Sequence, residues 1–131
     1  MMLFADTFYF IALLNTKDKM HARAIALTKG TERLLTTEWV LTELADGLAP
    51  RKQRGAFLSL LQRLRGRATV EIAHASHALF DRGIDLYSRR PDKDWSLTDC
   101  ISFIVMQEHG ITNALTGDHH FEQAGFNALL K

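Results

Sequence analysis

The chain has 131 residues, which is enough for one domain of ordinary size and too few for two. Its composition, 47% hydrophobic and 24% charged, excludes a disordered or fibrous chain. A single cysteine, Cys100, excludes an internal disulfide framework and a multi-cysteine zinc site, and it fits a reducing compartment. The net charge of +1 by itself indicates no class of partner. We therefore expect one globular domain over residues 1–131.

The apolar segments are too short to cross a membrane. The longest of them, residues 8–14 and 101–106, fall far below the roughly 20 residues that span a bilayer. The N-terminal apolar run has no Lys or Arg before it and is interrupted by Asp6, so it makes a poor signal peptide. We therefore expect a soluble cytoplasmic protein with no membrane partner.

Strands and helices are predicted to alternate along the chain. The expected strands are residues 2–5, 34–36, 68–72, 111–115 and 126–130. The expected helices are residues 8–14, 18–29, 37–48, 74–89 and 119–124, a stretch through Leu58, Leu61 and Leu64 that ends by Gly66, and a stretch from Ser96 or Thr98 to Gly110. Gly30 is expected to cap the second helix, and Pro50 and Pro91 follow the ends of two others.

This alternation predicts an α/β fold with a mainly parallel central sheet flanked by helices. In such folds, binding sites form beyond the carboxyl ends of the strands. Asp6 and Asp118 each follow a predicted strand closely, so we expect both at this edge of the sheet.

Asp6 and Glu43 are acids in largely apolar segments. Asp6 stands between the apolar residues 2–5 and 8–14, where an ionised carboxylate is costly unless it is paired or bound to a metal. A cap on the following helix explains Asp6 equally well. Glu43 falls at the edge of the apolar arc of its helix, where a solvated side chain is the simpler interpretation.

Asp99 and Asp118 also have structural explanations. Asp99 comes three residues after Ser96, as in a capping box, and Asp118 follows Gly117 where it can cap a helix. However, four acids at strand ends or helix starts of one sheet favour a shared site. If they converge, their repulsion raises their pKa values or requires a cation, and Mg²⁺ or Mn²⁺ suits an oxygen-only site. Such a metal activates water and stabilises charge on a phosphate, which predicts phosphodiester hydrolysis.

Four short motifs then resemble those of the PIN-domain family and, within it, of VapC-type ribonuclease toxins. They are the apolar strand ending in Asp6-Thr7, Thr-Glu-Leu at residues 42–44, Trp-Ser-Leu-Thr-Asp ending at Asp99, and Leu-Thr-Gly-Asp-His-His-Phe at residues 115–121 with Ala-Gly-Phe at 124–126. Each motif is short, but their order and spacing over the whole chain make the resemblance specific.

The resemblance implies a metal-dependent endoribonuclease, the toxin of a VapBC-type pair, with RNA as substrate and a cognate antitoxin as partner. It implies that the catalytic acids, which bind Mg²⁺ or Mn²⁺, are Asp6, Glu43, Asp99 and Asp118. Thr116 corresponds to a hydroxyl residue that orders the site. Phe8 departs from the family pattern, which often has Ser or Asn there, and it also excludes a haloacid-dehalogenase site, which needs a second Asp.

Basic residues cluster between positions 51 and 67, where six of the 16 lie with no acid among them. They are Arg51, Lys52, Arg54, Arg63, Arg65 and Arg67. Such a patch would hold RNA phosphates beside the acids, and we expect Arg51, Lys52 and Arg54 to contact RNA. A solvated helix face is the alternative interpretation.

His119 and His120 adjoin Asp118, but neighbours on a helix point in different directions and do not readily bind one metal. A surface role is favoured, and a contact of one of them with substrate is the alternative. Apolar residues of the middle helices, Trp39 and Leu58 among them, indicate a homodimer or a groove for an antitoxin segment, although core packing explains most of them.

Two other functions stay open: a PIN-like module that binds RNA or protein without cutting, and a small metal phosphatase.

Overall fold

Five short strands pair in parallel in the computed structural model, which describes residues 1–29 and 32–131. They are β1 (Met2–Ala5), β2 (Arg33–Thr37), β3 (Val70–Ala73), β4 (Asn113–Leu115) and β5 (Asn127–Ala128). Their order across the sheet is β3-β2-β1-β4-β5. The predicted α/β class and parallel sheet are confirmed.

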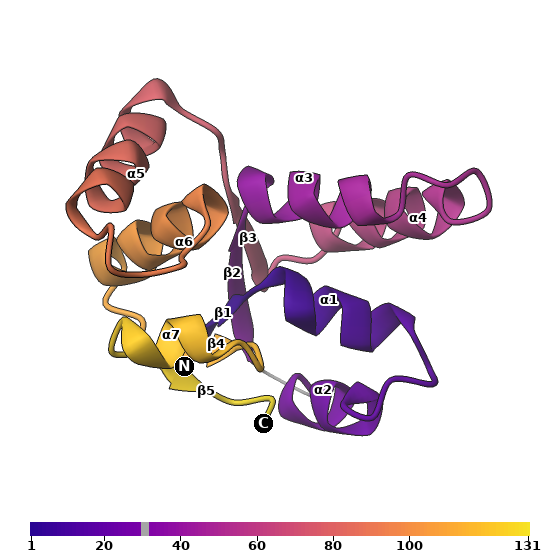
Figure 1. Ribbon diagram of the computed structural model, residues 1–131. Helices are drawn as coiled ribbons and strands as arrows, with labels where there is room; N and C mark the ends of the chain where they lie inside the picture. Colours follow the sequence, from indigo (N-terminus) through magenta and orange to yellow (C-terminus); the bar gives the residue numbers. More distant parts are fainter. Residues whose placement is uncertain (30–31) are drawn as a thin grey trace.

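Helices cover both faces of this sheet. They are α1 (Thr7–Leu14), α2 (His21–Leu27), α3 (Glu38–Gly47), α4 (Arg54–Arg65), α5 (His77–Arg89), α6 (Leu97–Glu108) and α7 (His119–Gln123). Figure 1 shows the sheet nearly edge-on, with α1 to α4 on one side and α5 to α7 on the other. Among the residues that the structure describes, no helix has the length and apolar character needed to cross a membrane.

The strand order reverses direction at β1. From β1 the chain builds outward through β2 to β3, then returns to place β4 on the other side of β1. The helices that follow β1 and β4 therefore lie on opposite faces, and a crevice opens between the carboxyl ends of these two strands. Asp6 and Thr116 are the residues that directly follow the two strands.

Aromatic packing holds α6 and α7 in place beside the sheet. Phe103 of α6 makes edge-to-face contacts with Trp95 and with Phe121 of α7. Phe121 also packs against Phe4 of β1. All four aromatic side chains are buried. Because these contacts join β1, α6 and α7, they fix the positions of the acids at the start of each helix.

Most element boundaries lie close to the predicted ones, with three differences. α2 begins at His21 instead of residue 18, because the Asp18 carboxylate accepts the Met20 N–H and forms a turn. α5 begins at His77, where Ser76 provides the N-cap. The last strand, expected over residues 126–130, has only two residues. Gly30, expected to cap a helix, lies outside the described residues.

Candidate metal-binding site

Asp6 and Thr116 meet where β1 and β4 end side by side. The register pairs Ala5 with Leu115, so the next residue of each strand projects at the same edge. The Thr116 hydroxyl donates a hydrogen bond of 2.8 Å to Oδ2 of Asp6, and both residues are buried. Asp6 occupies the N-cap position of α1, but its side chain makes no capping hydrogen bond. The carboxylate is therefore held by the neighbouring strand and does not cap the helix.

Glu43 reaches this edge from the exposed side of α3. Its Oε1 accepts a 2.6 Å hydrogen bond from the hydroxyl of Thr7, the first residue of α1. Thr7 directly follows Asp6, so this bond brings Glu43 close to Asp6. Glu43 is exposed to solvent, as the sequence favoured. Its side chain is nevertheless held by the hydrogen bond from Thr7.

Asp99 and Asp118 both cap helices, as the sequence allowed. Asp99 forms a capping box with Ser96, and Asp118 accepts the His120 N–H at 2.9 Å. The Asp118 N–H donates to the Thr116 hydroxyl at 3.1 Å, so Thr116 connects this residue to Asp6. These contacts use Oδ2 of Asp99 and Oδ1 of Asp118. Capping thus engages one oxygen of each carboxylate and is compatible with a second role.

The charges of the four acids influence one another. Burial raises the pKa of Asp6 from 3.8 to about 7, hydrogen bonds from Thr116 and the Thr7 N–H oppose this rise, and the charges of Asp99 and Glu43 add to it. Burial also raises the pKa of Asp99, the Ser96 N–H opposes the shift, and the charge of Asp118 adds to it. The structure therefore places Asp6 within reach of the charges of Glu43 and Asp99, and Asp99 within reach of the charge of Asp118.

Such a cluster suits a hard divalent cation. Its donors are carboxylate oxygens, which are the ligands that Mg²⁺ and Mn²⁺ prefer. A cation would also relieve the repulsion and desolvation that raise the pKa values of Asp6 and Asp99. The residues present therefore fit a divalent metal.

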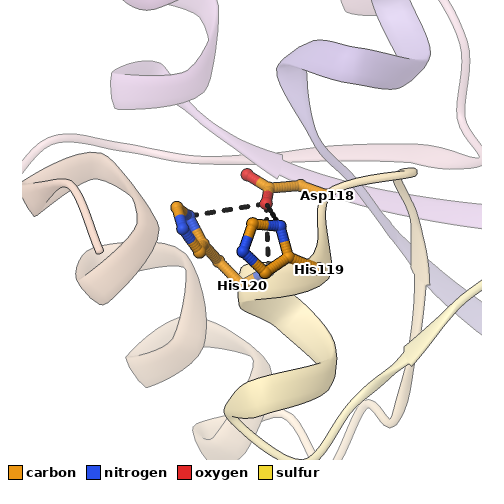
Figure 2. Close-up of side chains that lie close together, drawn as sticks. All are labelled: Asp118, His119 and His120. Carbon is orange, nitrogen blue, oxygen red and sulfur yellow. Dashed lines mark hydrogen bonds and ion pairs between the residues drawn. The ribbon is translucent and has the colours of Figure 1, made fainter. Parts of the chain in front are cut away.

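His120 lies at this site, although the sequence favoured a surface role for it. Its side chain is 19% exposed, whereas that of His119 is 69% exposed. Nδ1 of His120 lies 3.2 Å from Oδ2 of Asp99 and 3.4 Å from Oδ1 of Asp118. Figure 2 shows both imidazoles beside Asp118. His119 is thus exposed, whereas His120 is largely covered where α7 packs against α6.

A groove of about 510 Å³ adjoins the acids between α1, α3 and the start of α4. Its lining includes Thr7 and Glu43, the apolar residues Ile11 and Leu44, and Lys52. Of the three basic residues predicted to contact RNA, Lys52 shares the lining of this groove with Glu43.

The basic residues do not form one patch. α4 separates Arg51, Lys52 and Arg54 at its start from Arg63, Arg65 and Arg67 at its end. Its 12 residues span about 18 Å. The end of α4 leads into the amino end of β3, so it lies toward the edge opposite the acids. Arg54 is also engaged locally, because its Nε donates to the Ala49 carbonyl at 2.7 Å.

Comparisons with known proteins agree with this geometry. The PIN domain family profile matches residues 3–127. VapC20 of Mycobacterium tuberculosis, a 23S rRNA-specific endonuclease, is 32% identical over 126 residues, which cover 95% of each chain. Its crystal structure, described as that of a sarcin-ricin loop cleaving toxin, superposes with a TM-score of 0.82 at 28% identity over 95% of both chains. VapBC2 of Rickettsia felis, bound to a promoter DNA fragment, shares the fold with a TM-score of 0.70 and 16% identity over 98% of this chain and 96% of that one. The chain belongs to the PIN domain family.

Proposed function

We propose that this chain is a VapC-type endoribonuclease toxin that hydrolyses RNA phosphodiester bonds. The main support is its 32% identity to a 23S rRNA-specific endonuclease over 95% of both chains. The hydrogen bonds that join Thr116 to Asp6 and to Asp118, together with the bond between Thr7 and Glu43 beside Asp6, are the independent structural support. We place the activity in the cytoplasm, because the one cysteine fits a reducing compartment.

Asp6, Asp99 and Asp118 would hold Mg²⁺ or Mn²⁺, and Glu43 would bind it directly or through water. When bound, the cation supplies an activated water and charge stabilisation at the phosphate. Thr116 keeps the buried Asp6 carboxylate oriented through its hydroxyl. The four acids would be the catalytic residues of the enzyme.

The substrate that we propose is a structured loop of ribosomal RNA, by analogy with the named target of VapC20. Arg51, Lys52 and Arg54 would attract its phosphates, since RNA must approach an acidic site that would otherwise repel it. Lys52 is the best placed of the three, because it shares a groove with Glu43.

An antitoxin would be the natural protein partner. The groove is lined by Glu43 and by apolar residues of α1 and α3, so a polypeptide seated there would also cover Glu43. A homodimer is the second proposed assembly. Phe80, Ile84 and Tyr87 recur at helical spacing on α5 and are 42%, 40% and 52% exposed, which leaves an apolar stripe for a second copy.

Cleavage of defined RNAs tests the proposed activity. Purified, antitoxin-free protein would be incubated with a sarcin-ricin-loop hairpin and other structured RNAs in Mg²⁺, Mn²⁺ or EDTA. We expect metal-dependent cleavage that Asp99→Asn abolishes and that Asp81→Asn, an exposed acid on α5, leaves unchanged. Cleavage in EDTA, or by Asp99→Asn, would contradict the metal mechanism. RNA binding without cleavage under any metal would indicate the non-catalytic module instead.

A further inference from the structure

Asp99 and Asp118 are brought together from different elements, and His120 touches both. Asp99 lies in the first turn of α6, whereas Asp118 precedes α7. The His120 imidazole lies 3.2 Å from the Asp99 carboxylate and 3.4 Å from that of Asp118. It therefore bridges the two carboxylates.

The contacts decide which ring nitrogen carries hydrogen. Both oxygens face Nδ1, and an ionised carboxylate can only accept a hydrogen bond. Nδ1 must then be the donor, directed at Oδ2 of Asp99 with Oδ1 of Asp118 close by. Asp118 Oδ1 is also held by the His120 N–H, so one residue contacts it through both backbone and side chain.

We propose that His120 is a positioning residue whose Nδ1–H ties Asp99 to the Asp118 end of the site and so holds both carboxylates in place for the cation. The inference rests on the proposed metal site and goes beyond it, because it assigns a role to a residue outside the four acids. His120 acts through the two aspartates and is not itself a ligand. Donors that orient metal-binding side chains in this way typically contribute about ten- to a hundredfold in metal affinity.

A direct ligand role for His120 is the competing explanation. Asp118, His119 and His120 each place one donor atom within 4.8 Å of the others, which is close enough to surround an ion. A metal at Nδ1 of His120 would displace its hydrogen bond to Asp99, whereas a metal at Nε2 would leave that bond in place. The two explanations differ in which substitution preserves metal binding.

Calorimetric titration of the full chain with Mn²⁺ distinguishes them. In His120→Asn the amide nitrogen replaces Nδ1–H, so we expect an affinity within about threefold of the wild type. In His120→Leu and His120→Gln the donor is lost or displaced, and we expect at least about a tenfold weaker affinity. His119→Leu, at the neighbouring exposed position, is the matched control and should bind like the wild type.

A second readout does not depend on the metal. Nitrogen NMR of the metal-free protein reports which His120 ring nitrogen is protonated, and we expect the Nδ1–H tautomer. An Nε2–H tautomer, an unchanged affinity in His120→Leu, or His120→Asn as weak as His120→Leu would each overturn the inference.

If the wild type binds no Mn²⁺, the proposed metal site and its positioning by His120 both fail; the tautomer then reports only whether the hydrogen bond to Asp99 exists. Thermal unfolding of each variant verifies its fold, and His120→Asn against His120→Gln remains informative if His120→Leu is unstable.

Discussion

The hydroxyl of Thr116 lies 2.8 Å from Oδ2 of Asp6 and joins the ends of two adjacent parallel strands. The same hydroxyl accepts the N–H of Asp118 at 3.1 Å. One buried side chain thus contacts an acid on each side of the crevice. Because the hydrogen bond to Asp6 lowers the pKa that burial raises, Thr116 favours the ionised form that a metal needs.

Replacing Thr116 by Val should therefore raise the pKa of Asp6 further. The isosteric side chain removes a donor to a charged group, an interaction that typically contributes about 1.5–3 kcal/mol. We expect the rising limb of the pH profile of RNA cleavage to move toward higher pH and the rate at pH 7 to fall about tenfold. Thr116→Ser keeps the hydroxyl and should retain the wild-type profile. An unchanged midpoint of the pH profile in Thr116→Val would show that Thr116 does not influence the ionisation of Asp6.

The raised pKa of Asp6 predicts that the metal-free protein is more stable in mild acid. Burial raises the pKa of the folded carboxyl to about 7, whereas the pKa of an unfolded one is 3.8, so between these values the folded state holds the proton more tightly. The resulting stabilisation is complete below about pH 4 and is lost as the pH rises through 7. Asp99, whose pKa is also raised, contributes with the same sign.

Urea unfolding in EDTA at pH 5 and pH 8 measures this effect. We expect the free energy of unfolding of the wild type to fall by a few kcal/mol from pH 5 to pH 8. In Asp6→Asn the fall should be much smaller, because the amide cannot ionise. Asp6→Asn should also be the more stable protein at pH 8, and Mg²⁺ should restore stability to the wild type alone. The same pH dependence in both proteins would contradict an elevated pKa at Asp6.

Gly117 is required by close packing between Thr116 and Asp118. A Cβ at this position would lie 2.5 Å from Cζ of Phe8 and 2.6 Å from the carbonyl oxygen of Leu130. We expect Gly117→Ala to lower the free energy of unfolding by about 1–3 kcal/mol and to weaken metal binding, because the loop must move. Gly55→Ala in α4, where no atom lies within 4 Å, should be neutral or stabilising by up to about 1 kcal/mol. Equal stability of both variants in thermal unfolding would refute the packing argument.

The position of Phe8 also explains a departure from the family pattern. At this place a polar residue would support the first acid, but Phe8 packs against the Gly117 backbone. The support for Asp6 comes instead from Thr116, on another strand. The resemblance had already implied that Thr116 orders the site, but not that its hydroxyl bonds to Asp6, because strand neighbours are set by the sheet order.

The acids themselves were predictable because their signals are local. Asp6 follows an apolar strand, Asp99 completes a capping box and Asp118 caps a helix, and each pattern needs only a few neighbouring residues. The contact between Thr7 and Glu43 and the burial of His120 depend on how α1 meets α3 and how α6 meets α7. Such contacts arise from tertiary packing, which one sequence does not specify at this detail.

The separation of the basic residues along α4 gives a test with a built-in control. Lys52 shares a groove with Glu43, whereas Arg65 lies at the far end of α4. RNA bound for cleavage should therefore meet Lys52 and not Arg65. In the Asp99→Asn background, we expect Lys52→Ala to weaken RNA binding severalfold. It should also reduce the slope of the logarithm of the binding constant against the logarithm of salt concentration by about one, the loss of one phosphate contact. Arg65→Ala should change neither quantity in anisotropy titrations across a salt series. Equal losses from both would mean that RNA follows the whole helix, and a loss from Arg65→Ala alone would place the RNA away from the acids.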